Sequence, residues 1–167
     1  GDGSLRKAID SANTNAGADI ITFAIGSGVQ TIALVSSLPT ITDPVVIDGT
    51  TQPGYAGTPL IEVNGSSAGA GANGLTIYAG SSIVRGIAIN RFVATGGGVG
   101  GHGIVIDVSG GNRIEGCFIG TNVAGTLALA NGGSGIAIFG VAGSNQIGGT
   151  TPAARNVLSG NFSSGIQ

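Results

Sequence analysis

The chain has 167 residues and a formal net charge of −2, with 8% charged residues, 41% hydrophobic residues and 34 glycines. A disordered glycine-rich linker would lack this apolar content, so we expect one folded domain with many turns. The absence of a Lys/Arg cluster argues against a nucleic-acid partner, and the absence of a long apolar run argues against a membrane span. Cys117 is the single cysteine, which excludes an internal disulfide.

Residues 1–18 predict an amphipathic capping helix. Within SLRKAIDSANTNAG (4–17), helical spacing places four apolar residues on one stripe: Leu5, Ala8, Ile9 and Ala12. Ser4 suits the N-cap, and Gly17 suits the position that stops the helix. The first coil of a solenoid exposes apolar side chains and free strand edges, so we expect this helix to cover that end.

Residues 19–167 predict short strands separated by turns. Four β-branched apolar segments come first: IITFAI (20–25), QTIAL (30–34), VVIDG (45–49) and LIEVNG (60–65). Turn-rich pieces such as DGTTQPGYAGTP (48–59) lie between them. Because strands this short are not stable alone, each needs neighbours with which to pair.

A first pattern, X-Gly-Ile-X-Ile, then recurs along the chain. Its four copies are NGLTI (73–77), HGIVI (102–106), SGIAI (134–138) and the truncated SGIQ (164–167). Their glycines are separated by 29, 32 and 30 residues, which is the period of a coiled repeat whose strands pair with the preceding coil. We therefore expect two internal columns of aliphatic side chains: Leu75, Ile104, Ile136 and Ile77, Ile106, Ile138.

A second pattern, X-X-Ile-X-Gly, recurs as well, and in the third repeat successive patterns are about ten residues apart. Its copies are SIVRG (82–86), NRIEG (112–116), NQIGG (145–149) and NVLSG (156–160). The apolar positions break strict alternation at Gly86 and Gly116, so we expect the chain to turn a corner at both glycines. Asn112 and Asn145 are expected to stack between coils and to satisfy corner backbone groups. Three short strands in each turn of about thirty residues predict an all-β, three-sided parallel solenoid.

The amino-acid sequences of three segments resemble those of a known fold group. These are GSLRKAIDSANTNAGADIITF, SLPTITDPVVIDGTTQPGYAGTPLIEVNGSSAGAGANGLTI and IGGTTPAARNVLSGN. They are similar to the right-handed parallel β-helix segments of large bacterial surface and secreted proteins in the pectin-lyase-like group. The resemblance covers essentially the whole chain and implies a right-handed coil and a location outside the cytoplasm. It implies no activity, and the catalytic groups of the enzymes in the group match no motif here.

The acidic residues do not suggest a hydrolase, which needs carboxylates gathered on one outer face. They are dispersed along the chain: Asp2, Asp10, Asp19, Asp43, Asp48, Glu62, Asp107 and Glu115. Asp107 and Glu115 fall in one coil but on different expected faces. Aligning VRG with IEG places Arg85 one coil from Glu115, with Arg113 close by. We interpret this as a cross-strand charge pair on a solvent face, and a lyase site is the alternative.

The remaining candidates for chemistry have structural interpretations. His102 occupies the turn slot that Asn73 and Ser134 fill in other repeats. Cys117 aligns with Ile87 at an inward position, where a thiol behaves as a small apolar group. We therefore assign no catalytic, cofactor-binding or metal-binding residue.

Two alternatives to that assignment stay open. A structural calcium ion bound by loop carbonyls with Asp48 or Asp107 is the metal alternative. Four scattered aromatic residues could stack on sugars, but they form no platform in the sequence: Tyr55, Tyr78, Phe118 and Phe139.

The function expected from the sequence is a non-catalytic, rigid β-solenoid segment of a bacterial secreted or cell-surface protein. It would serve as a stalk or adhesion module, with surface glycans or other extracellular proteins as partners and with coils that continue beyond residue 167. One alternative is a carbohydrate-active enzyme or polysaccharide-binding module of the pectin-lyase-like group. Another is a fibre subunit that self-associates end to end.

Overall fold

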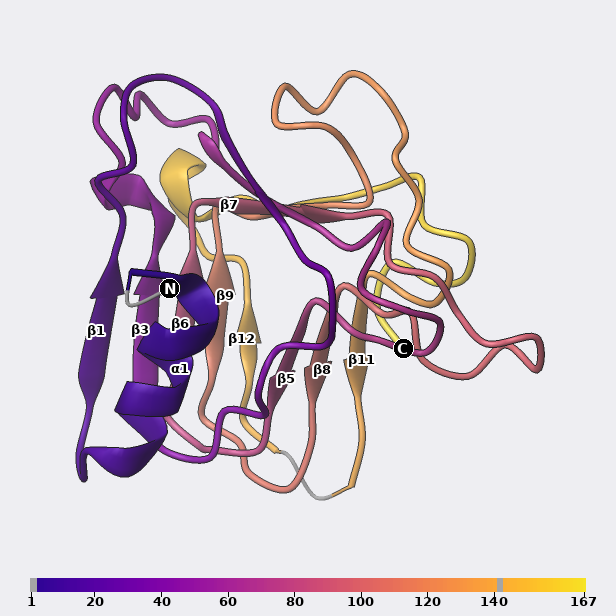
Figure 1. Ribbon diagram of the computed structural model, residues 1–167, viewed down its shortest axis with the longest axis horizontal. Coiled ribbons are helices and arrows are strands. Elements are labelled where there is room, and N and C mark those ends of the chain that lie inside the picture. The colour runs from indigo at the N-terminus through magenta and orange to yellow at the C-terminus, as the bar shows by residue number, and fades with distance from the viewer. Residues whose placement is uncertain (1–2, 141–142) are drawn as a thin grey trace.

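The computed structural model describes residues 3–140 and 143–167 and shows a parallel β-solenoid of about four turns with one N-terminal helix (Figure 1). The strands fall into three sheets, which the chain enters in the same cyclic order from residue 45 onward. Every pairing between named strands is parallel, and each strand lies beside its counterpart from the preceding turn. The predicted solenoid is therefore confirmed.

Two of the sheets contain five strands each. Sheet A consists of β1 (Asp19–Thr22), β3 (Val45–Asp48), β6 (Ile83–Arg85), β9 (Arg113–Glu115) and β12 (Gln146–Ile147). Sheet B consists of β2 (Gln30–Ala33), β4 (Ile61–Asn64), β7 (Ile87–Asn90), β10 (Phe118–Ile119) and β13 (Val157–Leu158). β1 and β2 are the edge strands at the N-terminal end of the stack.

Sheet C consists of β5 (Leu75–Ile77), β8 (Ile104–Ile106) and β11 (Ile136–Ile138). Single parallel bridges extend it at both ends, from Ile41 to Ile77 and from Ile136 to Ile166. Two short 3₁₀ helices, η1 (Gly49–Thr51) and η2 (Pro152–Ala154), lie in the turns that follow β3 and β12. No helix in the described part of the chain is long and apolar enough to cross a membrane.

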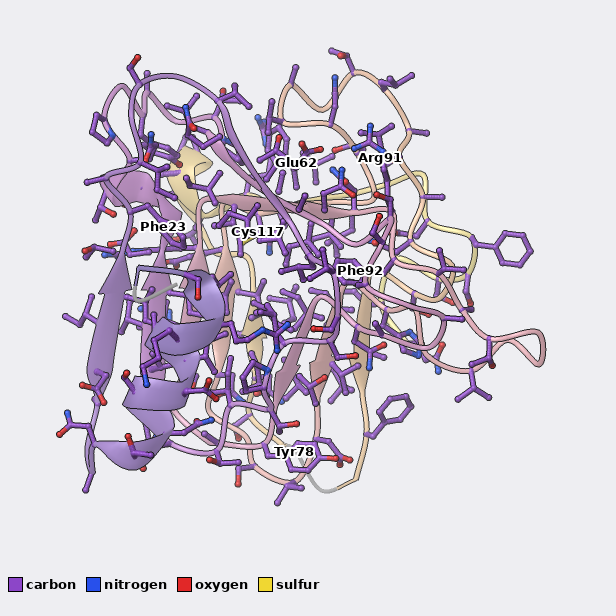
Figure 2. All side chains as sticks on the ribbon, in the orientation of Figure 1. Phe23, Glu62, Tyr78, Arg91, Phe92 and Cys117 are labelled. Carbon is purple, nitrogen blue, oxygen red and sulfur yellow. The ribbon has the colours of Figure 1, made fainter. Side chains whose placement is uncertain are left out.

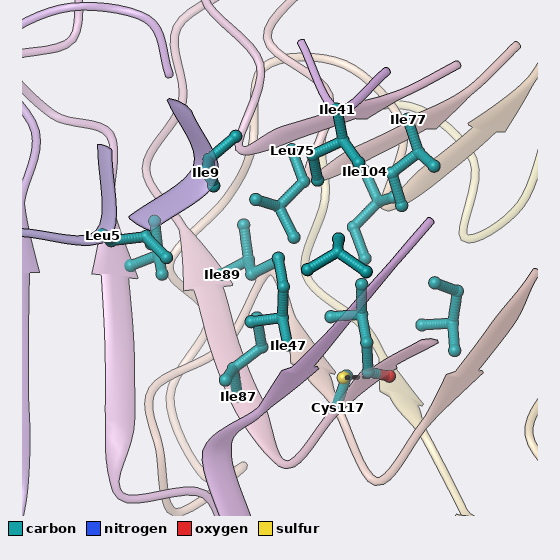
Figure 3. Packing of buried hydrophobic residues seen from close by; sticks show 14 of the residues in the cluster. Leu5, Ile9, Ile41, Ile47, Leu75, Ile77, Ile87, Ile89, Ile104 and Cys117 are labelled. Carbon is teal, nitrogen blue, oxygen red and sulfur yellow. Dashed lines mark hydrogen bonds between the residues drawn. The ribbon is translucent and has the colours of Figure 1, made fainter. Parts of the chain in front are cut away.

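Aliphatic columns fill the interior, as the repeat spacing predicts (Figure 3). The register pairs Ile104 with both Leu75 and Ile136, and it pairs Ile106 with both Ile77 and Ile138. All of these side chains are buried except that of Ile138, which is half-buried. Isoleucine fills every position of these two columns except that of Leu75, because β-branched side chains suit a pleated surface.

The corners predicted at Gly86 and Gly116 separate sheet A from sheet B. β6 ends at Arg85 and β7 begins at Ile87, and Gly116 has the same place between β9 and Cys117. Gly86 and Gly116 have φ values of 67° and 62°, in the left-handed region that glycine adopts without a steric penalty. The change of direction brings Ile87 and Cys117 into the interior, where both are buried.

Asparagine amides support the corners between turns. The Ser82 amide donates to Asn112 Oδ1 at 2.9 Å, and the Asn112 amide donates to Asn145 Oδ1 at 3.0 Å, so the predicted stack is confirmed. The grouping of NVLSG (156–160) with the other copies of the second pattern is wrong. Its strand β13 pairs with β10 in sheet B, and Asn156 Oδ1 accepts from the Cys117 amide instead of extending the Asn112 column.

The helix α1 (Leu5–Thr14) begins at Ser4, whose side chain accepts a hydrogen bond from the Lys7 amide. Leu5, Ile9 and Ala12 are buried against the interior, as the stripe predicts. The helix ends earlier than the predicted stop at Gly17, because Asn15 is extended and its amide already bonds to the last carbonyls. α1 contacts β1, and in the view of Figure 1 it lies in front of β3 and β6.

Candidate functional site

A row of polar and charged residues crosses the outer face of sheet A. The register pairs Asp48 with Arg85 and Arg85 with Glu115, so three successive turns present alternating charges at one position. Arg85 Nη2 lies 2.5 Å from Asp48 Oδ2, and Arg113 Nη2 lies 2.7 Å from Glu115 Oε2. The alignment of Arg85 with Glu115 is thus confirmed, but the predicted ion pair between them is wrong, since Arg85 bonds to Asp48 on its other side.

Asp48 is the most constrained member of this row. Its side chain caps η1, because Oδ1 accepts hydrogen bonds from the Thr50 amide at 3.0 Å and the Thr50 hydroxyl at 2.5 Å. Burial alone would raise the pKa of Asp48, but the hydrogen bonds from Arg85 and Thr50 lower it below its ordinary value. Asp48 therefore stays ionised, and a calcium ion bound there would have to displace the guanidinium of Arg85.

Arg85 lies between two carboxylates. Its hydrogen bond to Asp48 raises the arginine pKa, and the nearby charges of Asp48 and Glu115 act in the same direction. The Nε atom of Arg85 is buried and has no hydrogen-bond partner in the described part of the chain. Tyr55 lies against this pair, and burial is the main reason that its pKa is raised.

A groove of about 480 Å³ on the outer face of sheet A is lined by Arg85, Arg113 and Glu115, with Tyr55 beside them. One wall comes from the turn after β3, with Thr50 and Tyr55, and the other comes from the turn after β12, with Thr151 and Ala153. Both turns contain the sequence Gly-Thr-Thr, at 49–51 and 149–151, and both contain a 3₁₀ helix. This repeated turn is the signal by which the groove could have been recognised in the sequence.

The pairing of the carboxylates beside this groove differs from that of a glycosidase site. A glycosidase needs one carboxyl group with a raised pKa to act as the general acid, whereas the pKa of Asp48 is lowered. Glu115 is held by Arg113, so both carboxylates are paired with cations. Within the described residues, no three His, Cys, Asp or Glu side chains form a group that could hold a metal ion.

A second charged cluster, which the sequence did not reveal, lies on the outer face of sheet B. Glu62 is buried there, and its carboxylate accepts from the Thr31 hydroxyl at 2.7 Å and from Asn90 Nδ2 at 2.8 Å. Arg91 Nη1 lies 3.3 Å from Glu62 Oε1, and Figure 2 shows the two side chains close together. The loop that follows β10 lies beside this cluster, since the carbonyl of Thr121 accepts from Asn90.

Cys117 occupies the inward position predicted for it, and His102 lies in the same slot as Asn73 and Ser134 of the neighbouring turns. His102 Nδ1 accepts from the Ser134 amide at 3.0 Å, and burial lowers the histidine pKa. The ring meets that of Phe139 edge-on, with centroids 6.0 Å apart. Cys117 is fully buried, and burial raises its pKa to about 12, so the thiol is protonated near neutral pH.

The other candidate residues do not converge on one site. Asp107 follows β8 at sheet C and accepts from the Val108 amide, away from Glu115 in sheet A, as predicted. Tyr55 lines the groove on sheet A, whereas Tyr78 follows β5 of sheet C and lies far from Glu62 in Figure 2. Phe118 is half-buried and Phe139 is 39% exposed. The aromatic side chains are therefore distributed over different faces.

Comparison of the chain with protein-family models, with curated proteins and with solved structures finds no significant match.

Proposed function

We propose that the chain is a non-catalytic, rigid β-solenoid segment of a bacterial secreted or cell-surface protein, serving as a stalk or adhesion module. The three sheets are consistent with a three-sided coil, and parallel strands joined by crossovers are right-handed in nearly all proteins. The resemblance to pectin-lyase-like surface proteins supports the same geometry and an extracellular location.

The observation that carries this proposal is the unbroken aliphatic interior. Ile47, Val84 and Ile114 lie in one column of sheet A, are fully buried and bind each turn to the next. Bending the solenoid would separate these columns and break main-chain hydrogen bonds at once, so the segment resists bending. A spacer between an anchor and a binding region needs this property.

Polysaccharide cleavage assays test the non-catalytic part of this proposal. The purified chain is incubated with neutral and acidic polysaccharides, while new reducing ends and unsaturated uronate products are measured. We expect no product above that of the matched variant Glu115→Gln. A product that forms with the wild-type chain and disappears in Glu115→Gln would overturn the proposal in favour of an enzyme.

A second function, polysaccharide binding, is supported by the groove on sheet A. Tyr55 offers a ring and Arg113, whose side chain is 46% exposed, offers donors that suit carboxylated sugars. We expect acidic oligosaccharides to bind in calorimetric titrations and Arg113→Gln to weaken the binding several-fold. Lys7→Gln removes the same charge on α1 and is the control. Equal affinity for the two variants would exclude this groove as the binding site.

A further inference from the structure

Among the residues that the structure describes, no strand pairs with the outer edge of β1. The Asp19 amide donates to Pro44 O and the Phe23 amide donates to Thr51 Oγ1, so the amides at these odd positions face the next turn. Because main-chain groups alternate in direction along a strand, those of Ile20 and Thr22 face the free edge. β1 is the terminal strand of sheet A, and Ile20 is 67% exposed.

A groove of about 700 Å³ runs along this edge between β1 and α1. Ser4, Lys7 and Ser11 line the helix side, and Asp19 and Ile20 line the strand side. The groove therefore has a strand edge as one wall and a helix as the other, which is the arrangement that accepts an added extended strand.

The helix and the strand run in opposite directions along the groove. Asn15, at the C-terminal end of α1, donates through Nδ2 to Asp19 Oδ1 at 2.7 Å, where β1 begins. Ser4, at the other end of the helix, lines a smaller pocket together with Thr22 and Phe23. The residues of α1 and β1 each span about 13–15 Å, so the groove is bounded along its whole length.

The two ends of the groove differ in charge. At the Asp19 end, the last turn of α1 carries no basic residue to offset the negative end of the helix dipole. Asp19 Oδ2 is buried and has no hydrogen-bond partner among the described residues. Toward the other end, Lys7 lies in the first turn of the helix. An extended occupant would therefore be favoured by a basic group beside Asp19 and an acidic group toward Lys7.

We propose that this groove binds an extended segment of a partner protein, which adds to β1 as a further parallel strand and places a basic residue against Asp19. Parallel addition follows the direction of every strand pair in sheet A. A second copy of the chain fits less well, because β12, the other terminal strand of sheet A, consists of Gln146 and Ile147 and brings no charge. This inference is independent of the function proposed for the groove on sheet A.

Peptide titration followed by NMR tests the charge preference. The probe is the blocked peptide Lys-Val-Thr-Val-Thr-Val-Glu, and its control has Glu in place of Lys. We expect the amide signals of Ile20 and Thr22 to shift with the probe, and the control to bind about two- to fivefold more weakly. Asp19→Asn should remove that difference. Equal binding of both peptides by the wild-type chain would overturn the charge assignment.

Main-chain pairing is tested by two further peptides, each N-methylated at alternate residues. Only every second amide of an added strand faces β1, so we expect one methylation pattern to abolish binding and the other to preserve it. Ile20→Pro should weaken binding at least about fivefold by removing an edge donor, whereas Ile20→Thr retains that donor and should bind like the wild type. Equal loss with both methylation patterns would contradict strand addition even if Ile20→Pro failed to fold.

Sedimentation velocity of the chain alone distinguishes a partner from a second copy. We expect the chain to remain monomeric over a wide range of concentration. Self-association that Ile20→Pro abolishes would replace the proposed partner segment with a second copy of the chain.

Discussion

The two faces of sheet A share one register but differ in how their side chains are constrained. On the inner face, Ile47 and Val84 are fully buried among other aliphatic residues. On the outer face of the same strands, Asp48 pairs with Arg85, whose side chain is 41% exposed. The register therefore aligns residues equally well on both faces, while burial decides how much each of them contributes to stability.

The largest expected loss of stability comes from a charge placed in the interior. Ile106 is fully buried between Ile77 and Ile138, so Ile106→Asp would bury a carboxylate without a partner. We expect the substitution to destabilise the chain by at least about 4 kcal/mol, or to leave it unfolded. Chemical denaturation followed by circular dichroism measures this change in the free energy of unfolding.

Val108→Asp provides the matched control for that experiment. Val108 lies two residues away, is 53% exposed and has a φ of 72°, a conformation that Asp adopts more readily than Val. We expect the free energy of unfolding of the control to lie within about 0.5 kcal/mol of that of the wild type. If both variants lost stability equally, the inward assignment of Ile106 would be wrong.

A smaller loss of stability is expected from Asp48→Asn on the outer face of sheet A. The ion pair is partly solvated through Arg85, so we expect the variant to be less stable by about 1 kcal/mol at pH 7. The pKa of Asp48 is lowered from 3.8 in the folded chain, so this contribution is fully present well above pH 3.8. It should be lost as the pH falls below 3.8 and through the folded pKa.

Denaturation of the wild type and Asp48→Asn between pH 2 and pH 7 measures that loss. Plotted against pH, the free energies of unfolding of the two proteins should converge at the acidic end of this range. A gap of the same size at both ends would mean that the ionised carboxylate does not stabilise the fold. Asp10→Asn, an exposed substitution on α1, serves as the control for the general effect of removing a negative charge.

The interior of the solenoid was largely predictable from the sequence. Side chains alternate along a strand and the repeats recur at 29 to 32 residues, so the columns through Ile104 and Ile106 follow from spacing alone. The corner at Gly86 was predictable for the same reason, because the apolar pattern there breaks at a residue that tolerates left-handed backbone.

The partner of Arg85 was not predictable, because the spacing between β3 and β6 departs from the repeat. Val46 pairs with Ile83 across 37 residues, so a period of about thirty does not align Asp48 with Arg85. The prediction that NVLSG (156–160) belongs to the second pattern was wrong for the opposite reason. It matches the second pattern in composition, but it follows NQIGG (145–149) too closely to occupy the same sheet one turn later.

The buried Glu62 was missed because its surroundings come from a loop. Strand alternation gives it an outward position beside Thr31, which predicts exposure. The segment after β10 lies against this face, with the Thr121 carbonyl bonded to Asn90 and the Leu129 carbonyl bonded to the Arg91 amide. Periodicity describes the strands of a solenoid, but it does not describe where an inserted loop packs.

The smallest expected change in stability comes from the titration of His102, at the corner before sheet C. Its Nδ1 accepts from the Ser134 amide, so the folded chain favours the neutral ring, and burial lowers the pKa from 6.5. The unfolded chain therefore takes up the proton first, and stability should fall by a few tenths of a kcal/mol as the pH drops below 6.5 toward the folded pKa.

His102→Asn sharpens this test, because Asn73 fills the same slot one turn earlier and its Oδ1 accepts from the His102 amide. An asparagine at position 102 can keep an acceptor for Ser134 without a group that titrates in this range. We expect the variant to show a flatter free energy of unfolding between pH 7 and pH 5.5 than the wild type. A wild-type curve that rises as the pH falls would mean that the protonated ring is the favoured form, and that the bond from Ser134 does not fix the neutral state.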